Sequence, residues 1–192
     1  MILQLFASGP ANSTIDALYG AIVAQARLSS FYLAYGVPDT VEGRFDMIVL
    51  HLALTLRRLA REREPLRKLG QAIFDRFCRD MDHNLREIGV GDLSVPKEMR
   101  HLAEAFYGRA KVYERALAAT DDELLAVALA KNVLAEVGPP SGKAMYLAAY
   151  VREVARKLDQ SNVNSFAGGF VSFPDPNALF ETAGREGGGS TL

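Results

Sequence analysis

The segment from Phe45 to Leu59 restricts the fold most strongly, because its apolar residues cover every side of the helix that it predicts. A helix without a polar face has to be surrounded by other parts of the protein. The segment therefore predicts the central helix of a bundle, with Asp39 or Thr40 as its N-cap. One apolar stripe comprises Phe45, Ile48, Val49, Leu52, Leu56 and Leu59, and Met47, Leu50 and Leu54 cover the opposite side.

Five other segments repeat apolar residues at helical spacing, so the sequence predicts an all-α fold, a single compact bundle of about six helices. One helix should start at Pro65, stop at Gly89 and carry a stripe that includes Ile88. Thr120 and Glu123 have the spacing of a capping box. The other expected starts are Ser13, Ser94 or Val95–Pro96, and Ser141. The last two helices should run through Leu124, Val127, Ala128 and Leu134, then through Met145, Tyr146, Ala149 and Leu158.

Two parts of the chain lack this periodicity. Residues 29–38 predict a loop or short extended piece whose aromatic side chains fold back onto the core. We divide the chain into a helical domain, residues 1–160, and a Gly- and Phe-containing extension, residues 161–192, whose end from Gly184 should be disordered. The phenylalanines of the extension predict a strap on the core, with a partner-docking segment as the alternative. They are Phe166, Phe170, Phe173 and Phe180.

The composition narrows the possible functions. A net charge of −1 does not favour DNA or another polyanion as a partner of the whole surface. Cys78 is the only cysteine, which excludes an internal disulfide and a cysteine-based zinc site. The longest apolar run, residues 45–56, falls far short of the ~20 residues of a membrane-spanning helix. Because the start has no basic leader, we expect a cytoplasmic location, with peripheral contact at the inner membrane left open.

No group of residues predicts catalysis. Glu98 and His101 match the Glu-x-x-His spacing of di-iron bundles, but they form a single such pair, and His101 should face solvent. The segment that starts at Asp80 begins like a calcium loop but lacks the required glycine and glutamate. His51 lies in the apolar run and should be a hydrogen-bonded core residue. We therefore expect no catalytic residue, cofactor or metal, and the rival hypothesis is a small-molecule-binding helical enzyme that uses His51.

Polar residues occur at unexpected positions of the helix over residues 65–88. Asn84 falls on its apolar stripe, Asp80 lies on the flank, and Arg76 is one turn earlier. A polar side chain that faces a core needs a partner. One interpretation is a network that fixes the Gly89–Gly91 hinge, with Asp80 bound to Arg76 and Asn84 to a free backbone group. The other is a recognition cleft between this helix and the next.

A basic cluster lies around the turn that follows the central helix. Cations near a helix C-terminus are common, so a solvated turn is one interpretation. The other is contact with an anionic surface, either ribosomal RNA or acidic lipid headgroups. The chain would then act as a peripheral membrane or ribosome-associated interaction protein through this turn. The cluster comprises Arg57, Arg58, Arg61, Arg63, Arg67 and Lys68.

Five phrases occur in order along the chain: Tyr35–Asp46, Asp80–Asp82, Asn84–Glu87, Gly89–Asp92 and Ala105–Arg109. Together they resemble the ubiquinol–cytochrome c chaperone family, over roughly residues 29–118. The resemblance implies a non-enzymatic assembly factor that helps cytochrome b, or an early intermediate, into the respiratory ubiquinol–cytochrome c reductase. It also implies, for mitochondrial relatives, a small partner protein and work at the ribosome. Because the sequence shows no transit peptide, we expect a bacterial member.

Client recognition should use polar residues beside the hinge, because their density is high and no catalytic geometry accompanies them. We expect a groove there that contacts the client or a partner. The candidate residues are Glu42, Arg44, Asp80, Asn84, Arg86, Asp92, Tyr107 and Arg109.

Overall fold

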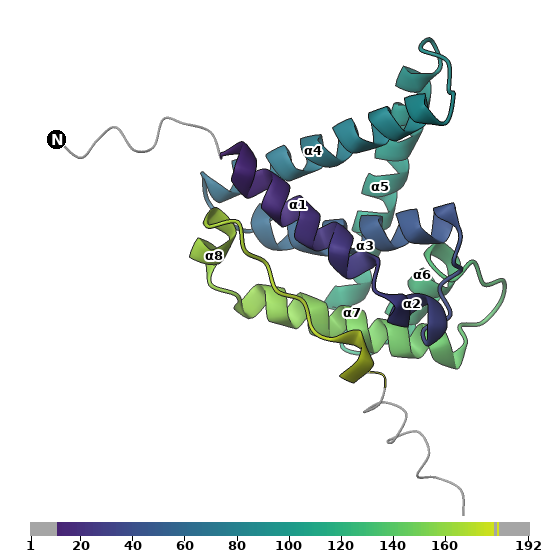
Figure 1. Cartoon of the computed structure of the whole chain (residues 1–192). Coiled ribbons are helices and arrows are strands. Elements are labelled where there is room, and N and C mark those ends of the chain that lie inside the picture. The colour runs from purple at the N-terminus through teal and green to yellow at the C-terminus, as the bar shows by residue number, and fades with distance from the viewer. Residues whose placement is uncertain (1–10, 179, 181–192) are drawn as a thin grey trace, which may run out of the picture.

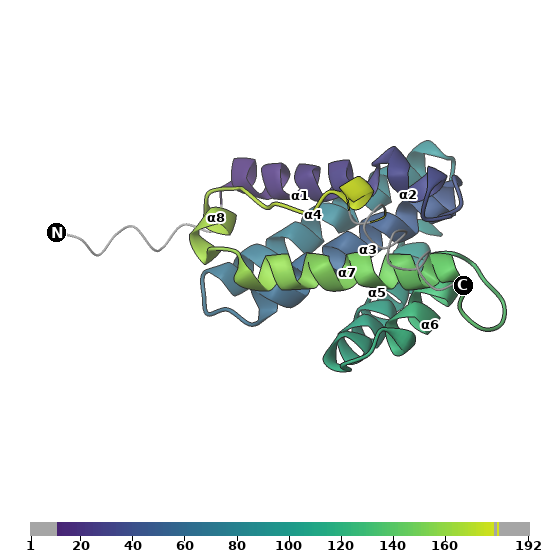
Figure 2. The ribbon, with the colours of Figure 1, turned by 90° about the horizontal axis from the view of Figure 1, so that it is seen from below.

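The computed structural model describes residues 11–178 and 180, and these residues form eight helices and no strand. The predicted all-α bundle is confirmed, with two short helices more than expected. Figures 1 and 2 show α3 in the middle of the molecule, and α1, α4, α5 and α7 contact it. The helices are α1 (Asn12–Ala26), α2 (Ser29–Leu33), α3 (Val41–Ala60), α4 (Leu66–Glu87), α5 (Val95–Ala118), α6 (Glu123–Asn132), α7 (Gly142–Gln160) and α8 (Val163–Ala167).

Helix α3 forms the centre of the core, as its sequence predicts. Every residue from Met47 to Thr55 is buried. Thr40 is the N-cap, and its side-chain oxygen accepts a hydrogen bond from the Gly43 backbone nitrogen at 3.1 Å. Gly43 also permits a close approach, since a Cβ there would lie 2.1 Å from the carbonyl oxygen of Pro38. The segment that enters α3 is therefore fixed at both its cap and its first turn.

His51 is fully buried at the middle of α3 and has a hydrogen-bond partner for each ring nitrogen. Its Nδ1 lies 2.8 Å from the Met47 carbonyl oxygen, and its Nε2 lies 2.8 Å from the Tyr150 hydroxyl. Because a carbonyl only accepts, Nδ1 carries the hydrogen and the Tyr150 hydroxyl donates to Nε2. Burial lowers the pKa of His51 to about 4. The prediction of a hydrogen-bonded core histidine is confirmed.

The predicted start of α6 is wrong. Thr120 does not form a capping box with Glu123, because the helix begins at Glu123 with Asp122 as the cap residue. The Glu123 backbone nitrogen instead donates to Asp121 Oδ1 at 3.1 Å, and Asp122 forms an ion pair with Arg152 of α7. Because Arg152 draws the Asp122 carboxylate toward α7, the start of α6 depends on this contact between two helices.

Only some of the apolar residues that mark α6 and α7 in the sequence lie in the core. Leu124 and Val127 are exposed, and so are Met145 and Ala149. Both helices are rich in alanine and leucine on several faces, so spacing alone did not determine which stripe faces the core. The side chains that are buried instead include Leu125 and Leu129 on α6, and Leu147 and Val151 on α7.

The two segments without periodicity both pack against the bundle. Residues 29–33 form the short helix α2 where a loop or extended piece was expected, and Phe31 and Tyr35 are buried as predicted. After α8, residues 169–178, here called the strap, run back over α7 toward α2 (Figure 2). The strap prediction is confirmed for three phenylalanines but not for Phe170, which is 63% exposed. The expected disordered end from Gly184 lies outside the described residues.

We predict that His51 makes the protein less stable in acid. The folded-state pKa of about 4 lies below the ordinary value of about 6.5, so the unfolded chain binds the extra proton first. The free energy of unfolding should therefore fall as the pH drops from 6.5 toward 4, by up to roughly 3 kcal/mol from this group. Denaturant unfolding across this pH range measures the effect.

A His51→Gln variant should lack this component of the pH dependence, whatever its stability at neutral pH. The matched control is His101→Gln, because His101 is exposed. The same pH slope in wild type and His51→Gln would contradict the assignment.

Candidate client-binding site

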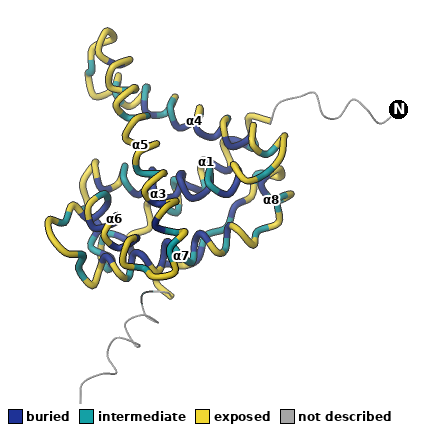
Figure 3. Tube along the Cα trace, turned by 180° about the vertical axis from the view of Figure 1, so that it is seen from behind, coloured by how far each residue is buried: buried dark blue, intermediate teal, exposed yellow. Residues whose placement is uncertain are grey.

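The hinge of the sequence analysis is the tip of an arm formed by α4 and α5. Figure 1 shows the end of α4 and the start of α5 rising away from the other helices, and Figure 3 shows that this end is mostly exposed. Gly89 has φ +88°, a conformation that favours glycine, and it ends α4 sharply. The backbone nitrogen of Val90 donates to the Leu85 carbonyl at 3.0 Å and closes the turn.

Two large aliphatic side chains lie exposed at the arm tip. Ile88 is 76% exposed and Leu93 is 98% exposed. The prediction that Ile88 belongs to the inward stripe of its helix is wrong, because α4 continues past the helices that would cover it. Sequence analysis missed Leu93, although a large aliphatic residue among the polar residues of a turn was a usable signal. The tip thus presents apolar surface to solvent.

Several polar residues at the end of α4 and in the turn after it are paired with one another. Arg86 donates to Asp82 at 2.8 Å and also forms an ion pair with Asp92 across the turn. His83 lies 3.1 Å from Glu87. The Asp82 contact lowers the pKa of that carboxyl group, since the hydrogen bond from Arg86 favours its charged form. These paired polar side chains occupy the same turn as the aliphatic pair.

Asn84 does not face the core, which corrects the sequence analysis. Its side chain is exposed on the part of α4 that extends beyond the bundle. The expected bond from Asn84 to a free backbone group is not among its contacts, and the apolar stripe of α4 is fully covered only as far as Met81. Helical spacing placed Asn84 correctly on the apolar stripe of α4, but no other helix packs against that stripe at Asn84.

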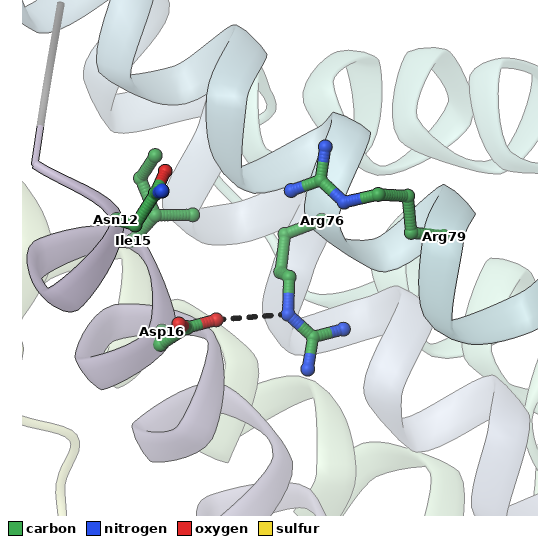
Figure 4. A pocket seen from close by; sticks show the side chains of 5 residues that line it. All are labelled: Asn12, Ile15, Asp16, Arg76 and Arg79. Carbon is green, nitrogen blue, oxygen red and sulfur yellow. Dashed lines mark hydrogen bonds and ion pairs between the residues drawn. The ribbon is translucent and has the colours of Figure 1, made fainter.

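Asp80 belongs to a network between α4 and α1. Arg76 lies 3.5 Å from Asp80, as the sequence predicted, and also 2.9 Å from Asp16 of α1. The Tyr19 hydroxyl donates to Asp80 at 2.8 Å. Burial, and then the bond to Asp80, raises the pKa of Tyr19. Figure 4 shows Arg76 reaching Asp16 at the edge of a shallow pocket, which Asn12, Ile15 and Arg79 also line. These bonds join two helices of the bundle.

Three neighbouring residues of α5 lie in different surroundings: Phe106 is in the core, Tyr107 is largely exposed, and Arg109 forms an ion pair. Phe106 is buried, with its ring centroid 4.9 Å from that of Phe74. Tyr107 is 58% exposed and lies against the other side of Phe74 at 5.4 Å. Arg109 forms an ion pair with the half-buried Asp46 of α3. Burial raises the pKa of Asp46, the Arg109 guanidinium opposes that rise, and Glu42 adds to it.

The eight predicted client residues therefore do not line a single groove. Asn84, Arg86 and Asp92 lie at the arm tip, whereas Tyr107 is twelve residues beyond Val95, or about 18 Å along α5 at 1.5 Å per residue. Asp80 faces α1. Glu42, Arg44 and Arg109 lie near the start of α3, and there Arg44 binds Asp39 at 2.7 Å and covers the Tyr32 ring.

Most of the basic cluster is neutralised by carboxylates. Arg58 is buried and donates to the Leu158 carbonyl at 2.9 Å, so it does not contribute to an exposed cationic surface. Among the described residues, only Arg63 and Lys68 of the cluster lack an ion pair and remain exposed. The pairs are Arg57 and Arg61 with Asp159, Arg58 with Glu62, and Arg67 with Glu64.

The remaining chemical candidates are dispersed. Within the described residues, no three side chains of the metal-ligating types come together, and His101 is exposed on α5. No helix that the structure describes is both long and apolar enough to cross a bilayer. His51 lies in packed core and lines neither of the two best-formed pockets.

These elements define an all-α helical-bundle protein with a projecting two-helix arm. The chain belongs to the ubiquinol-cytochrome C chaperone family, whose model matches residues 33–173. This match includes α3, the whole arm, α6, α7, α8 and the first half of the strap. It confirms the resemblance seen in the sequence.

Relatives support the same assignment. The chain is 25% identical over 142 residues to ubiquinol-cytochrome-c reductase complex assembly factor 1 of Xenopus laevis, covering 74% of this chain and 70% of that protein. The human protein of that name is also 25% identical, over 145 residues, but this chain spans only 48% of its length. The crystal structure of the Cbp3 homolog from Brucella abortus matches with 41% identity and a TM-score of 0.79, over 86% of this chain and 91% of that one.

We predict that Arg109 stabilises the fold through Asp46. Arg109→Ala leaves a half-buried carboxylate without its cation, which should cost roughly 1–3 kcal/mol of unfolding free energy. Asp46→Asn in the same chain should restore much of the loss, because it removes the unpaired charge. Denaturant unfolding of the two variants measures both effects.

The matched control is Arg86→Ala, which removes an arginine whose two carboxylate partners lie at the exposed arm tip. It should leave stability nearly unchanged. An equal loss in Arg86→Ala and Arg109→Ala would contradict the distinction between the two ion pairs.

Proposed function

We propose that the protein binds cytochrome b, or an early assembly intermediate that contains it, during assembly of ubiquinol–cytochrome c reductase. Membership of the ubiquinol-cytochrome C chaperone family supports this proposal, as do relatives named as assembly factors of that complex. The protein would act by binding and release, without a chemical step. A contact of this kind needs an accessible surface that a client can cover.

The observation that carries the proposal is the exposed aliphatic pair at the arm tip. Ile88 and Leu93 are largely exposed there, at 76% and 98%. Complete burial of one such side chain contributes roughly 1.5–3 kcal/mol, so two of them can anchor an apolar client segment. Part of that gain is offset by the loss of freedom on association, which keeps the contact reversible. Reversibility suits a chaperone that later releases its client.

The paired charges near the aliphatic pair would set the orientation of the client. Arg86 is held by Asp82 and Asp92, so little of its charge is available to attract an anion by itself. A client that covers the tip can contact these paired side chains while its own apolar side chains cover Ile88 and Leu93. Central apolar anchors with a polar rim are the usual arrangement of a protein interface. Of the eight candidate residues named from the sequence, the proposed site at the arm tip retains Asn84, Arg86 and Asp92.

We predict that deletion of the gene removes assembled ubiquinol–cytochrome c reductase and lowers mature cytochrome b, and that the wild-type chain restores both. A chain with Ile88→Ser and Leu93→Ser should restore little, because loss of both aliphatic anchors weakens client binding roughly tenfold or more. Spectroscopy of membrane cytochrome b and native gels of the complex provide the readout.

The control variant is Leu33→Ser, which removes another strongly exposed aliphatic side chain, at 83%, but from α2 rather than the arm. It should complement like wild type, and both variants should unfold at wild-type denaturant concentrations. Normal cytochrome b in the deletion strain would refute the function. Full complementation by the tip variant would refute the arm tip as its site.

A further inference from the structure

The strap lies on a surface of side-chain donors contributed by α1, α2 and α7, together with Tyr35 just beyond α2. Gln25 Nε2 donates to the Pro174 carbonyl at 3.0 Å, and Lys157 Nζ donates to the Phe173 carbonyl at 2.9 Å. The Tyr35 hydroxyl donates to the Pro176 carbonyl at 2.7 Å. All three hydrogen bonds are accepted by main-chain oxygens. They therefore recognise the path of the strap backbone more than the identity of its side chains.

Aromatic rings form the apolar part of the same surface. The Phe173 ring meets the edge of His51 at a centroid distance of 5.4 Å. Phe180 lies between Tyr35 at 5.2 Å and Tyr146 at 5.1 Å. A peptide on this surface therefore needs an aromatic side chain at each end and carbonyl oxygens between them.

The surface is held in place by groups outside the strap. The Tyr150 hydroxyl donates to His51 and accepts from Gln25 at 2.9 Å, which fixes the Gln25 amide close to the strap. Phe31 lies against both Tyr150 and Tyr35, with ring centroids at 5.0 and 5.6 Å. None of these contacts involves a strap residue. The donors are thus preorganised for a segment with the backbone path of the strap, which is non-helical up to Asp175 and helical from Pro176.

Side chains of the surface below hold the strap. In the part of the chain that the structure describes, the hydrogen bonds that tie residues 171–177 to the helices all involve those side chains. Val171, Pro174 and Pro176 are buried, whereas Asp175 and Asn177 are exposed. The strap leaves α8 through two glycines, the second of which has φ +81°. One face of the strap therefore packs on the bundle, and the other faces solvent.

We propose that the surface beneath the strap is a binding site for a proline-containing peptide segment of another protein, which is non-helical at first and ends in a helical turn as the strap does, and that the strap fills this site in the free chain. The pattern it would recognise is Phe-Pro-x-Pro, with the carbonyls of the first two residues and of the second proline as acceptors. Proline suits such a site because it favours an extended backbone. It also has no backbone N–H, so it leaves no donor that would need a partner. This peptide site is separate from the arm tip and does not depend on which client the protein binds.

The strap is covalently linked to the rest of the chain, and an external peptide has to compete with it for the site. A tethered segment acts at an effective concentration in the millimolar range, so a separate peptide should bind wild type poorly. Weakening the strap within the chain should therefore reveal binding of a peptide that keeps the original sequence. Phe173→Ala removes the ring on His51 but changes no residue of the surface below.

The experiment measures binding of a fluorescent peptide with the sequence of residues 169–180 to the full chain. The Phe173→Ala chain should bind it saturably and at least about tenfold more tightly than wild type does. Adding Tyr35→Phe to that chain should weaken binding about fivefold, since it removes one donor and keeps the ring. Circular dichroism confirms that each variant retains its helices. A folded Phe173→Ala chain that binds no peptide would overturn the proposal.

A second form of the experiment avoids any loss of folding from Phe173→Ala. A protease site is inserted between Gly168 and Gly169 of the full chain, and the chain is nicked after folding. The released segment should exchange with the labelled peptide while the helices stay folded. Unfolding on nicking, or a segment that never exchanges, would show that the strap is a fixed part of the core. A dimer that exchanges straps would assign the site to a second copy and would equally overturn the proposal.

Discussion

The burial of α3 is the constraint on which the rest of the structure depends. Its apolar residues leave no face for water, so four other helices have to surround it. The polar group in its middle, His51, is accommodated because Met47 and Tyr150 satisfy both ring nitrogens. The same requirement orients Tyr150 and Gln25, and through Gln25 it contributes to the surface that holds the strap.

The arm follows from the lengths of the surrounding helices. Helices α4 and α5 are the two longest described, and both extend past the region that α3 and its neighbours fill. Near the bundle they are tied by buried aromatic rings and by the pairs Arg109–Asp46 and Arg76–Asp16. Beyond it, the described part of the arm carries local ion pairs and the exposed aliphatic pair. If the tip binds the client as proposed, the contacts that stabilise the fold and those that bind the client lie at opposite ends of the arm.

The sequence was sufficient for the fold class, the central helix and the caps at Thr40 and Ser141, because these depend on local spacing and local hydrogen bonds. It was insufficient where the outcome depends on what lies opposite a helix. Asn84 and Ile88 occupy the apolar stripe of α4, yet no helix covers that stripe at the tip. Leu124 and Leu125 are equally apolar, and only the position of α7 decides which is buried. The candidate groove separated into distinct places for the same reason, since spacing along a helix does not give the distance between two helices.

The most direct test of the account is a photo-crosslink from the arm tip in native membranes. A photoreactive amino acid at position 93 should capture cytochrome b or an intermediate that contains it, identified by mass spectrometry. The same amino acid at position 33, which is 83% exposed against 98% for position 93 but lies on α2, should capture far less of it. Capture of cytochrome b from position 33 and not from position 93 would contradict the assignment of the arm tip as the client-binding site.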